Sequence, residues 1–522
     1  MAEIERVGSV TYQRAGQEYF EQRKLKRHAR VWSLWALGVG AVISGEFSGW
    51  NFGLDAGGFG GLLVATLVIT VMYFGLCWSI AEMSPALPHT GGAYSFARSA
   101  MGPWGGFATG VAETIEYVVT PAVIVTFAAS YLQSIFNSWF SWSPATWVWW
   151  LILYVIFVVL NIVGVEASFR FTVAICLLAL GILAFFYVAS LWHLTGSLTD
   201  VKGSGGHAGW FPFGLKGTFL ALPFAIWFYL AIEELPLAAE ESHDPKRDIP
   251  RGTIYGLLTL VVFAFLVLFL NTKVTGANAI KTSGEPLLDG FRAIFGAGGE
   301  TTANILGLAA VAGLIASFHT IIFAYGRNVY SLSRAGYYPH FLSKTHGTRN
   351  TPYIALIGGA VVGFGLALLL DQATKHAWLS GHLSAALLSM AVGGAVVSYF
   401  LQMVSFILLR RNYPDIERPY KSPVGIYGAA VAAVIALLSL GALFWRADYR
   451  PGVVGVAVFY LLALLYFALS GRHKLVLSPE EEFAVTRGKH GDPAAEGYGR
   501  TEAERSGPPV APPAPAPEPG SA

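Results

Sequence analysis

Apolar runs of about 20 residues recur along almost the whole chain and alternate with short polar or charged stretches. In helical form, a run of this length crosses the roughly 30 Å hydrocarbon core of a bilayer. The pattern therefore predicts an all-α integral membrane protein with twelve transmembrane helices. The expected spans are 31–53, 58–82, 104–134, 145–164, 169–193, 217–239, 252–271, 302–333, 353–371, 383–410, 424–445 and 452–471.

The composition of the chain agrees with this class. Hydrophobic residues make up 54% of the 522 residues and charged residues only 13%, which excludes an ordinary soluble protein. The net charge of +2 indicates no nucleic-acid partner, so the expected partners are the lipid bilayer and a small molecule. Both cysteines lie within apolar runs, which predicts no disulfide framework. The oligomeric state is left open.

Basic residues predict how the chain is oriented. Lys24, Lys26, Arg27 and Arg30 precede the first span, and alternation from this start puts more Lys and Arg in the inner loops than in the outer ones. Such an excess marks the cytoplasmic side of a membrane protein. We therefore expect a multi-pass protein of the cytoplasmic membrane with both termini in the cytoplasm.

The two ends of the chain differ from the apolar part. Residues 1–30 are polar and charged, without the apolar stretch of a signal peptide, and form the expected cytoplasmic N-terminal segment. The last residues are charged and then rich in Pro, Ala, Gly and Glu, a composition that buries little apolar surface. We therefore predict a disordered cytoplasmic tail over 472–522.

The most informative residue of the first span is Glu46, in the sequence SGEFSG at 44–49. A carboxylate at bilayer depth costs several kcal/mol, so such a residue usually faces a water-filled path or a ligand. The flanking Ser-Gly pairs are poor helix formers and favour a break, and we expect the helix to be unwound near 44–47. A carboxylate within a broken helix at this depth predicts a binding site for a cation.

A second interruption is predicted in the sixth span, where Pro223 and Pro236 enclose the adjacent carboxylates Glu233 and Glu234. Spans one and six are five apart, and interrupted helices at matching positions are typical of inverted-repeat transporters with a midplane site. The alternative is that the prolines only kink the helix. The repeats are expected at about 31–193 and 217–410, followed by two extra helices at about 424–471.

Three stretches resemble the amino acid–polyamine–organocation permeases. EMSPALPHTGGAYSFAR at 82–98, followed by MGPWGGF at 101–107, is similar to the loop after helix two of this superfamily. AEESHDPKRDIPRG at 239–252 resembles its loop after helix six, and GRNVYSLSRAGYYP at 326–339 resembles the end of its helix eight. The resemblance covers about residues 30–470 and implies a secondary transporter with a five-plus-five repeat of the leucine-transporter type.

Within this superfamily, SGEFSGWNFGL at 44–54 looks most like the ethanolamine permeases. Typical amino acid permeases carry Gly-x-Gly-Ile/Leu-Phe here, and bare backbone amides take the substrate carboxylate. An acid at position 46 repels that carboxylate. The resemblance therefore implies a substrate with an amine and no acid group, and ethanolamine is such a substrate.

The resemblance also implies where the substrate binds. Glu46 is the expected partner of the ammonium group, unless backbone N–H groups of the broken helix hold it. Glu233 matches an acid that lies near the substrate or acts in proton coupling, and Ala231 replaces the glycine of that motif. Glu116 lands where relatives line the cavity, although it could instead pair with a polar group of a neighbouring helix. The expected substrate-binding residues are Ser44, Gly45, Glu46, Phe47, Glu116, Trp227, Phe228, Ala231 and Glu233.

Aromatic and further ionisable residues complete the candidate site. Trp227 falls at an aromatic gate of relatives and forms, with its aromatic neighbours, a candidate cage for an ammonium group; packing against lipid is the alternative. Two adjacent acids such as Glu233 and Glu234 do not both ionise cheaply, which suits proton coupling. For His319 and Arg327 a structural role is favoured.

No motif of catalysis or ATP binding is found, so we predict no enzyme and no cofactor. The favoured function is import of a small amine, most like ethanolamine, by alternating access. A general amino acid permease, an amine/amino acid exchanger and a transporter-like amine sensor are the alternatives. Proton symport, sodium symport, exchange and uniport all remain open, because the fifth span has no lysine near Ala179, where several proton-coupled relatives carry one.

Overall fold

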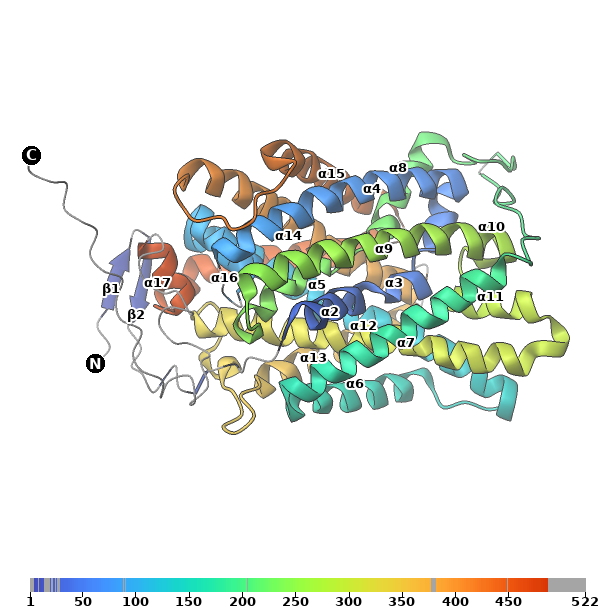
Figure 1. Ribbon diagram of the computed structural model, residues 1–522, viewed down its shortest axis with the longest axis horizontal. Helices are drawn as coiled ribbons and strands as arrows, with labels where there is room; N and C mark the ends of the chain where they lie inside the picture. Colours follow the sequence, from blue (N-terminus) through green and yellow to red (C-terminus); the bar gives the residue numbers. More distant parts are fainter. Residues whose placement is uncertain are drawn as a thin grey trace, which may run out of the picture.

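The computed structural model shows a long bundle of helices with a small sheet at one end (Figure 1). It describes residues 4–7, 9–13, 19, 22–23, 25, 29–87, 89, 91–203, 205–376, 382–447 and 449–486. Both terminal segments lie at the end that carries the sheet, which we call the terminal end, while α10 and α11 lie at the opposite end.

Helices form nearly all of the regular structure. Their bounds are α2 Val31–Val42, α3 Ser44–Phe47, α4 Phe52–Ala86, α5 Ala93–Phe140, α6 Thr146–Val163, α7 Val165–Ser190, α8 Gly214–Ile226, η1 Ile232–Glu241, α9 Pro245–Thr275, α10 Ala277–Ile280, α11 Pro286–Phe295, η2 Ala297–Gly299, α12 Glu300–Arg334, η3 His340–Ser343, α13 Tyr353–Lys375, α14 Leu383–Asn412, α15 Gly425–Trp445, α16 Arg450–Leu469, η4 Gly471–His473 and α17 Pro479–Thr486. The three strands are β1 Ile4–Val7, β2 Val10–Gln13 and β3 Leu475–Val476. β1 pairs antiparallel with β2, and β2 pairs parallel with β3.

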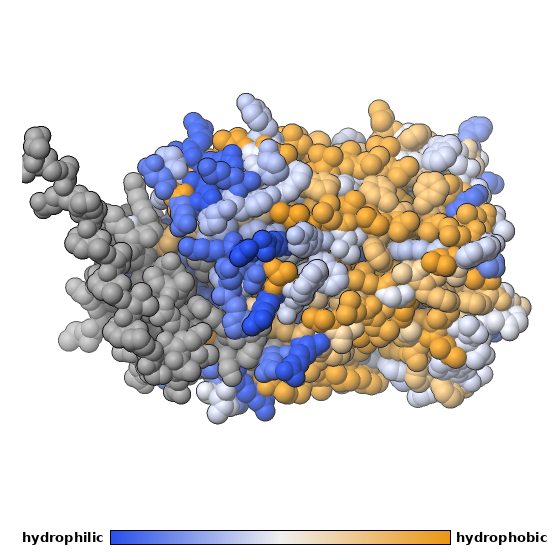
Figure 2. Space-filling view, viewed as in Figure 1, coloured by the Kyte–Doolittle hydropathy of each residue, from blue (hydrophilic) through white to orange (hydrophobic). Residues whose placement is uncertain are grey.

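The bundle has the surface of a membrane protein. Ten helices in the described part of the chain are long and apolar enough to cross a bilayer. Figure 2 shows a broad apolar surface bordered by hydrophilic residues toward the terminal end. Large apolar side chains such as Leu461 and Val361 are more than half exposed, as expected where lipid replaces water. The prediction of an all-α membrane protein is confirmed.

The first and sixth predicted spans are each built from separate short helices. Val31–Phe47 and Gly214–Ile226 are apolar segments shorter than the ten long helices, and the chain turns irregularly after each. The predicted interruption of both helices is therefore present. The count of twelve crossings and the five-plus-five repeat remain predictions.

Two predicted span starts fall next to a kink at which two helical segments join. α4 starts at Phe52 and runs through the predicted gap at 54–57, with a kink at Gly58 (φ 69°). α5 likewise starts before span 104–134 and bends at Gly102 (φ 77°). Both glycines occupy the left-handed half of the Ramachandran map, which a glycine enters without a Cβ clash.

The predicted disorder of 472–522 is wrong at its beginning. Residues Leu475–Val476 form β3 and Pro479–Thr486 form α17, which packs beside the sheet at the terminal end (Figure 1). Ordering occurs because this segment finds charged and apolar partners on the bundle, as shown below. The rest of the predicted tail, 487–522, lies outside the described residues.

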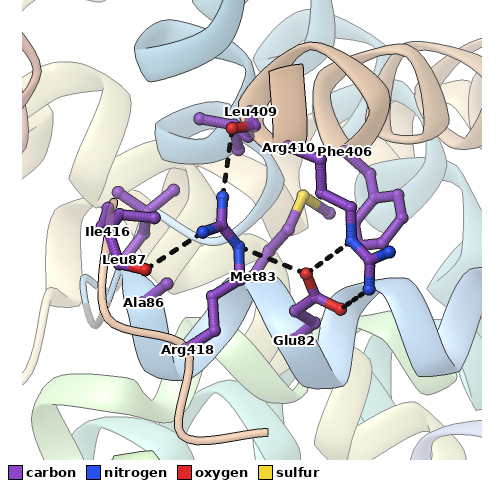
Figure 3. A pocket seen from close by; sticks show the side chains of 9 residues that line it. All are labelled: Glu82, Met83, Ala86, Leu87, Phe406, Leu409, Arg410, Ile416 and Arg418. Atoms are coloured by element: carbon purple, nitrogen blue, oxygen red, sulfur yellow. Dashed lines mark hydrogen bonds and ion pairs between the residues drawn. The ribbon is translucent and has the colours of Figure 1, made fainter. Parts of the chain in front are cut away.

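A buried ion pair fixes the terminal end of α4 to α14 and the loop after it. Glu82 is 1% exposed and accepts hydrogen bonds from Arg410 Nε at 2.8 Å and from the Ser422 backbone N–H at 2.7 Å. Arg418 Nε lies 3.3 Å from the same carboxylate, beside a small pocket (Figure 3). The arginine pair explains how this carboxylate is buried.

Candidate substrate site

The interrupted parts of the first and sixth helices touch each other. A Cβ added to Gly45 would lie 2.4 Å from the carbonyl oxygen of Trp227, so only glycine permits this approach. The Trp227 indole Nε1–H donates to the Ser48 carbonyl oxygen at 3.0 Å. These contacts bring the predicted site residues of the two helices into one region.

The break in the first helix lies about one turn later than predicted. Residues Ser44–Phe47 still form a helical turn, α3, and Ser48 N–H donates to the Ser44 carbonyl at 3.0 Å. The irregular stretch is Ser48–Asn51, where Gly49 has φ 97°. The predicted unwinding at Ser44–Phe47 is therefore corrected: Gly49 supplies the positive φ, whereas Gly45 supplies the close approach.

The break in the sixth helix is centred on Trp227–Ala231, between α8 and η1. Ala231 adopts a left-handed conformation with φ 82° and ψ 4°. This conformation costs a residue with a Cβ roughly 1–2 kcal/mol. The sixth helix is thus interrupted even though alanine replaces the glycine of the family motif.

Glu46 is a buried carboxylate without a hydrogen-bond partner. Its exposed fraction is 0%, and neither carboxylate oxygen has a hydrogen bond among the described residues. It lies in α3, which packs against α9 and α12, and its electrostatic neighbours are Tyr187 of α7 and Tyr229. An unpartnered carboxylate oxygen in the interior is costly, and this residue carries two.

Three further acids form a cluster with two tyrosines. Tyr399 O–H contacts Glu116 Oε1 and Glu233 Oε2, each at 3.0 Å. Tyr117 O–H lies 3.3 Å from Glu233 Oε1 and 3.4 Å from Glu113 Oε1. All three acids are at most 3% exposed. The structure therefore brings together the two predicted site acids of helices three and six, and adds Glu113.

The contacts of Tyr399 leave a place for a proton in this acid cluster. An ionised carboxylate only accepts hydrogen bonds. Tyr399 has a single O–H for its two carboxylate contacts. No ion pair joins the cluster to a basic side chain within the described residues. A proton on Glu116 or Glu233 would supply the second donor that these two Tyr399 contacts need.

Glu46 is separate from the acid cluster, and aromatic residues lie between them. Tyr229, the neighbour of Glu46, contacts the ring of Tyr73 with centroids 5.2 Å apart. Tyr73 O–H in turn donates to Tyr399 O at 3.1 Å. No described hydrogen bond or ion pair joins Glu46 directly to Glu116 or Glu233. The predicted site residues thus form two groups connected by tyrosines.

The rings of the predicted aromatic cage have protein neighbours. Phe228 stacks on Trp50 with centroids 5.8 Å apart, and Trp227 meets the ring of Phe127 at 6.4 Å. Phe47 lies against Gly313 of α12, where a Cβ would be 2.2 Å from the ring. Ser44, which is also among the expected substrate-binding residues, is 3% exposed. A cage around an ammonium group remains a prediction.

The two helix-eight residues have structural partners, as favoured from the sequence. His319 contacts Asn161 Nδ2 at 3.0 Å and Ser168 Oγ at 2.8 Å. Arg327 Nη2 lies 2.8 Å from Glu241 Oε1, and both side chains are buried. Sequence reasoning missed Tyr73, Tyr117 and Tyr399; their position in the middle of apolar spans is the only signal, and many tyrosines share it.

Comparison with known proteins identifies the family. The sequence model of the amino acid permease family matches residues 30–469, so the chain belongs to this family. An uncharacterized transporter of Rhizobium meliloti is 27% identical over 453 residues, covering 85% of this chain and 91% of that protein. The methylthioribose transporter of Bacillus subtilis is 23% identical (87% and 96% covered), and the branched-chain amino acid permease BcaP of the same organism is 24% identical (87% and 95%). The chain is thus a permease-family membrane protein of the amino acid–polyamine–organocation superfamily.

Proposed function

We propose that this permease imports a small amine without an acid group, with ethanolamine as the best test substrate, across the cytoplasmic membrane by alternating access. The observation that carries the proposal is Glu46, whose two carboxylate oxygens are buried and unpartnered beside the two helix breaks. A primary ammonium group donates up to three hydrogen bonds, and charge-assisted bonds of this kind are short and strong. Such a substrate would satisfy both oxygens.

The same residue argues against an acidic substrate. The carboxylate of an amino acid bound at the break in helix one would lie beside Glu46, and like charges in a dry site repel by several kcal/mol. The second candidate is nevertheless a general amino acid permease, because several relatives, including BcaP, are named as amino acid permeases. The methylthioribose transporter among the relatives is favourable to a substrate outside the amino acids.

We further propose that the coupling ion is a proton held by the acid cluster. Glu116 and Glu233 belong to helices three and six, and Tyr399 contacts both, so a proton held there would lie between the interrupted helix and its neighbour. Movement of η1 away from α5 would separate the two carboxyls, so that each could ionise and release the proton. The family's alternating access supplies such a movement in principle.

The test is uptake of labelled ethanolamine into proteoliposomes, with proton, sodium and potential gradients imposed separately. We expect saturable uptake that an inward proton gradient accelerates. Unlabelled ethanolamine should compete, serine should not, and choline should compete poorly because its quaternary head has no N–H donors. Competition by serine equal to that by ethanolamine would favour the general amino acid permease. Specific binding without flux would favour a transporter-like sensor.

A further inference from the structure

Both terminal segments of the chain meet on the terminal end of the bundle. In the parallel pairing of β2 with β3, Tyr12 lies opposite Leu475. The backbone N–H of Val476 in β3 donates to the carbonyl of Ala335, directly after α12, at 2.9 Å. The N-terminal and C-terminal segments are therefore joined to each other and to the end of α12.

α17 adds a fully buried carboxylate to this junction. Glu481 accepts hydrogen bonds from Tyr12 and Tyr94 at 2.6 Å, and from Tyr337 at 3.0 Å. Its carboxylate also pairs with Arg98 Nε at 2.5 Å. These partners come from β2, from the start of α5 and from the turn after α12, so one side chain connects three separate parts of the molecule.

The neighbouring acid, Glu480, connects α17 with α12 and the sixth helix. It is 1% exposed, forms an ion pair with Arg334 and accepts a hydrogen bond from Ser331 Oγ at 3.1 Å. Arg334 Nη2 also binds Glu240 of η1 at 2.7 Å. Burial by itself raises the pKa of the Glu480 carboxyl, but Arg334 outweighs this effect and the pKa lies below its usual range. The carboxylate is therefore ionised and paired.

This arrangement differs from that of an ordinary charged tail. Consecutive glutamates such as those at 480–482 are usually solvated, whereas Glu480 and Glu481 are buried and matched to arginines of the bundle. The arginines stand on α5 and α12, and Arg334 is also bound to the interrupted helix six. In alternating access one group of helices moves against another, and a movement of η1 relative to α5 and α12 would break these contacts.

We propose that β2, β3 and α17 form a clasp that holds the terminal end of the permease closed, and that this end opens only when the clasp is released. The charge pattern of the loops predicts that this end faces the cytoplasm, so the clasp is an autoinhibitory contact of the inner side. It does not depend on which substrate is carried.

Cysteine labelling tests the clasp without a substrate. Both native cysteines are buried. Asn328 is 1% exposed and lies on α12 between the acid cluster, where its amide donates to Glu113, and Arg334. In an Asn328→Cys background, truncation after Lys474 removes β3 and α17, whereas truncation after Thr486 leaves the clasp intact and is the matched control. The measurement is the rate of labelling by a water-soluble maleimide.

We expect labelling to become about tenfold faster after the truncation at 474, because loss of a charge-assisted contact shifts a closed–open equilibrium by roughly that factor. The truncation at 486 should leave the rate unchanged. Glu480→Gln, which keeps the pair between Arg334 and Glu240, is the second variant and decides the question if the shorter chain does not fold. It should label several-fold faster. Unchanged labelling in either folded variant overturns the proposal.

Discussion

Buried acids at the terminal end of this permease and buried acids in its interior have different partners. Those at the terminal end each form an ion pair with an arginine; they are Glu82, Glu240, Glu241, Glu480 and Glu481. Those in the interior have no ion pair among the described residues; they are Glu46, Glu113, Glu116, Glu233 and Glu234. Glutamate side chains that are similarly buried therefore have their charge balanced by an arginine at the terminal end, but not in the interior.

The difference separates acids that hold the fold from acids that are available to a ligand. A buried carboxylate with an arginine recovers its lost hydration through the pair, and removal of one partner is then strongly destabilising. A buried carboxylate without a cation contributes no such pair to the fold, which makes it a candidate for binding a ligand or a proton. Four experiments test this distinction, and they are ordered here by expected effect.

The largest effect is expected for Arg327→Ala at the terminal end. The substitution leaves Glu241 buried without its cation and removes the contact of the guanidinium with the Phe323 ring. We expect a loss of about 3–5 kcal/mol of stability, measured as a lower unfolding midpoint and reduced recovery of monodisperse protein. Arg170→Ala, at an exposed pair with Glu166, is the control and should change little. Equal stability of the two variants would show that the buried pair of Arg327 contributes no more to the fold than the exposed pair of Arg170.

The next effect is expected for Glu46→Gln in the interior. Loss of a charge-assisted bond costs about 1.5–3 kcal/mol, which weakens amine affinity about 10- to 150-fold. Because Glu46 has no cationic partner, the unfolding midpoint should not fall. Glu166→Gln makes the same chemical change at another glutamate, so it is the matched control and should retain uptake. A lower midpoint with unchanged affinity would assign Glu46 to the fold.

An intermediate case lies at the end opposite the termini. Burial raises the pKa of Glu285 to about 7, although Arg292 lies 3.1 Å away. Because this pKa lies above the ordinary value of 4.5, the stability contributed by the neutral carboxyl is fully present below pH 4.5 and lost as the pH rises through 7. We expect a loss on the order of 1–3 kcal/mol between pH 5 and 8. Glu285→Gln should remove that dependence; the same pH profile in wild type and variant would contradict the assignment.

The smallest effect is expected for Tyr399→Phe, which removes one hydroxyl from the acid cluster. A neutral hydrogen bond contributes about 0.5–1.5 kcal/mol, so transport should fall about 2- to 12-fold. The pH profile of kcat/KM should shift as well, because the hydroxyl contacts both carboxyls that are proposed to hold the coupling proton. Tyr325→Phe, which removes a buried hydroxyl bonded to the Leu356 carbonyl, is the control. An unshifted profile would exclude the cluster from proton coupling.

The sequence predicted the class of fold and the existence of both helix breaks, because composition, proline and Ser-Gly pairs act locally. It placed the first break about one turn too early. Gly45 and Gly49 look alike in the sequence, but one admits the Trp227 carbonyl and the other takes a positive φ. Which glycine performs which role depends on the partner helix, and a local pattern does not contain that information.

The predicted site residues fall into two groups in the structure. The motif positions of Glu116 and Glu233 indicated a common cavity, and the structure joins them, but it leaves Glu46 in a separate group. Tyr399 is one of 23 tyrosines and carries no distinguishing neighbour in sequence. The buried state of Glu480 and Glu481 was missed for a similar reason: their arginines are distant in sequence, so a run of acids resembles a solvated tail.

The clasp also has a consequence for the order in which the molecule is made. Tyr12 and Glu481 are separated by 469 residues, so at roughly 5–20 residues per second the N-terminal strand emerges roughly 20–90 s before its partners. Until then β1 and β2 form at most an isolated hairpin, which is marginal in water. The closure of this end is therefore completed last, after every membrane helix has been synthesised, and a chain that stops before residue 475 enters the membrane with this end unclasped.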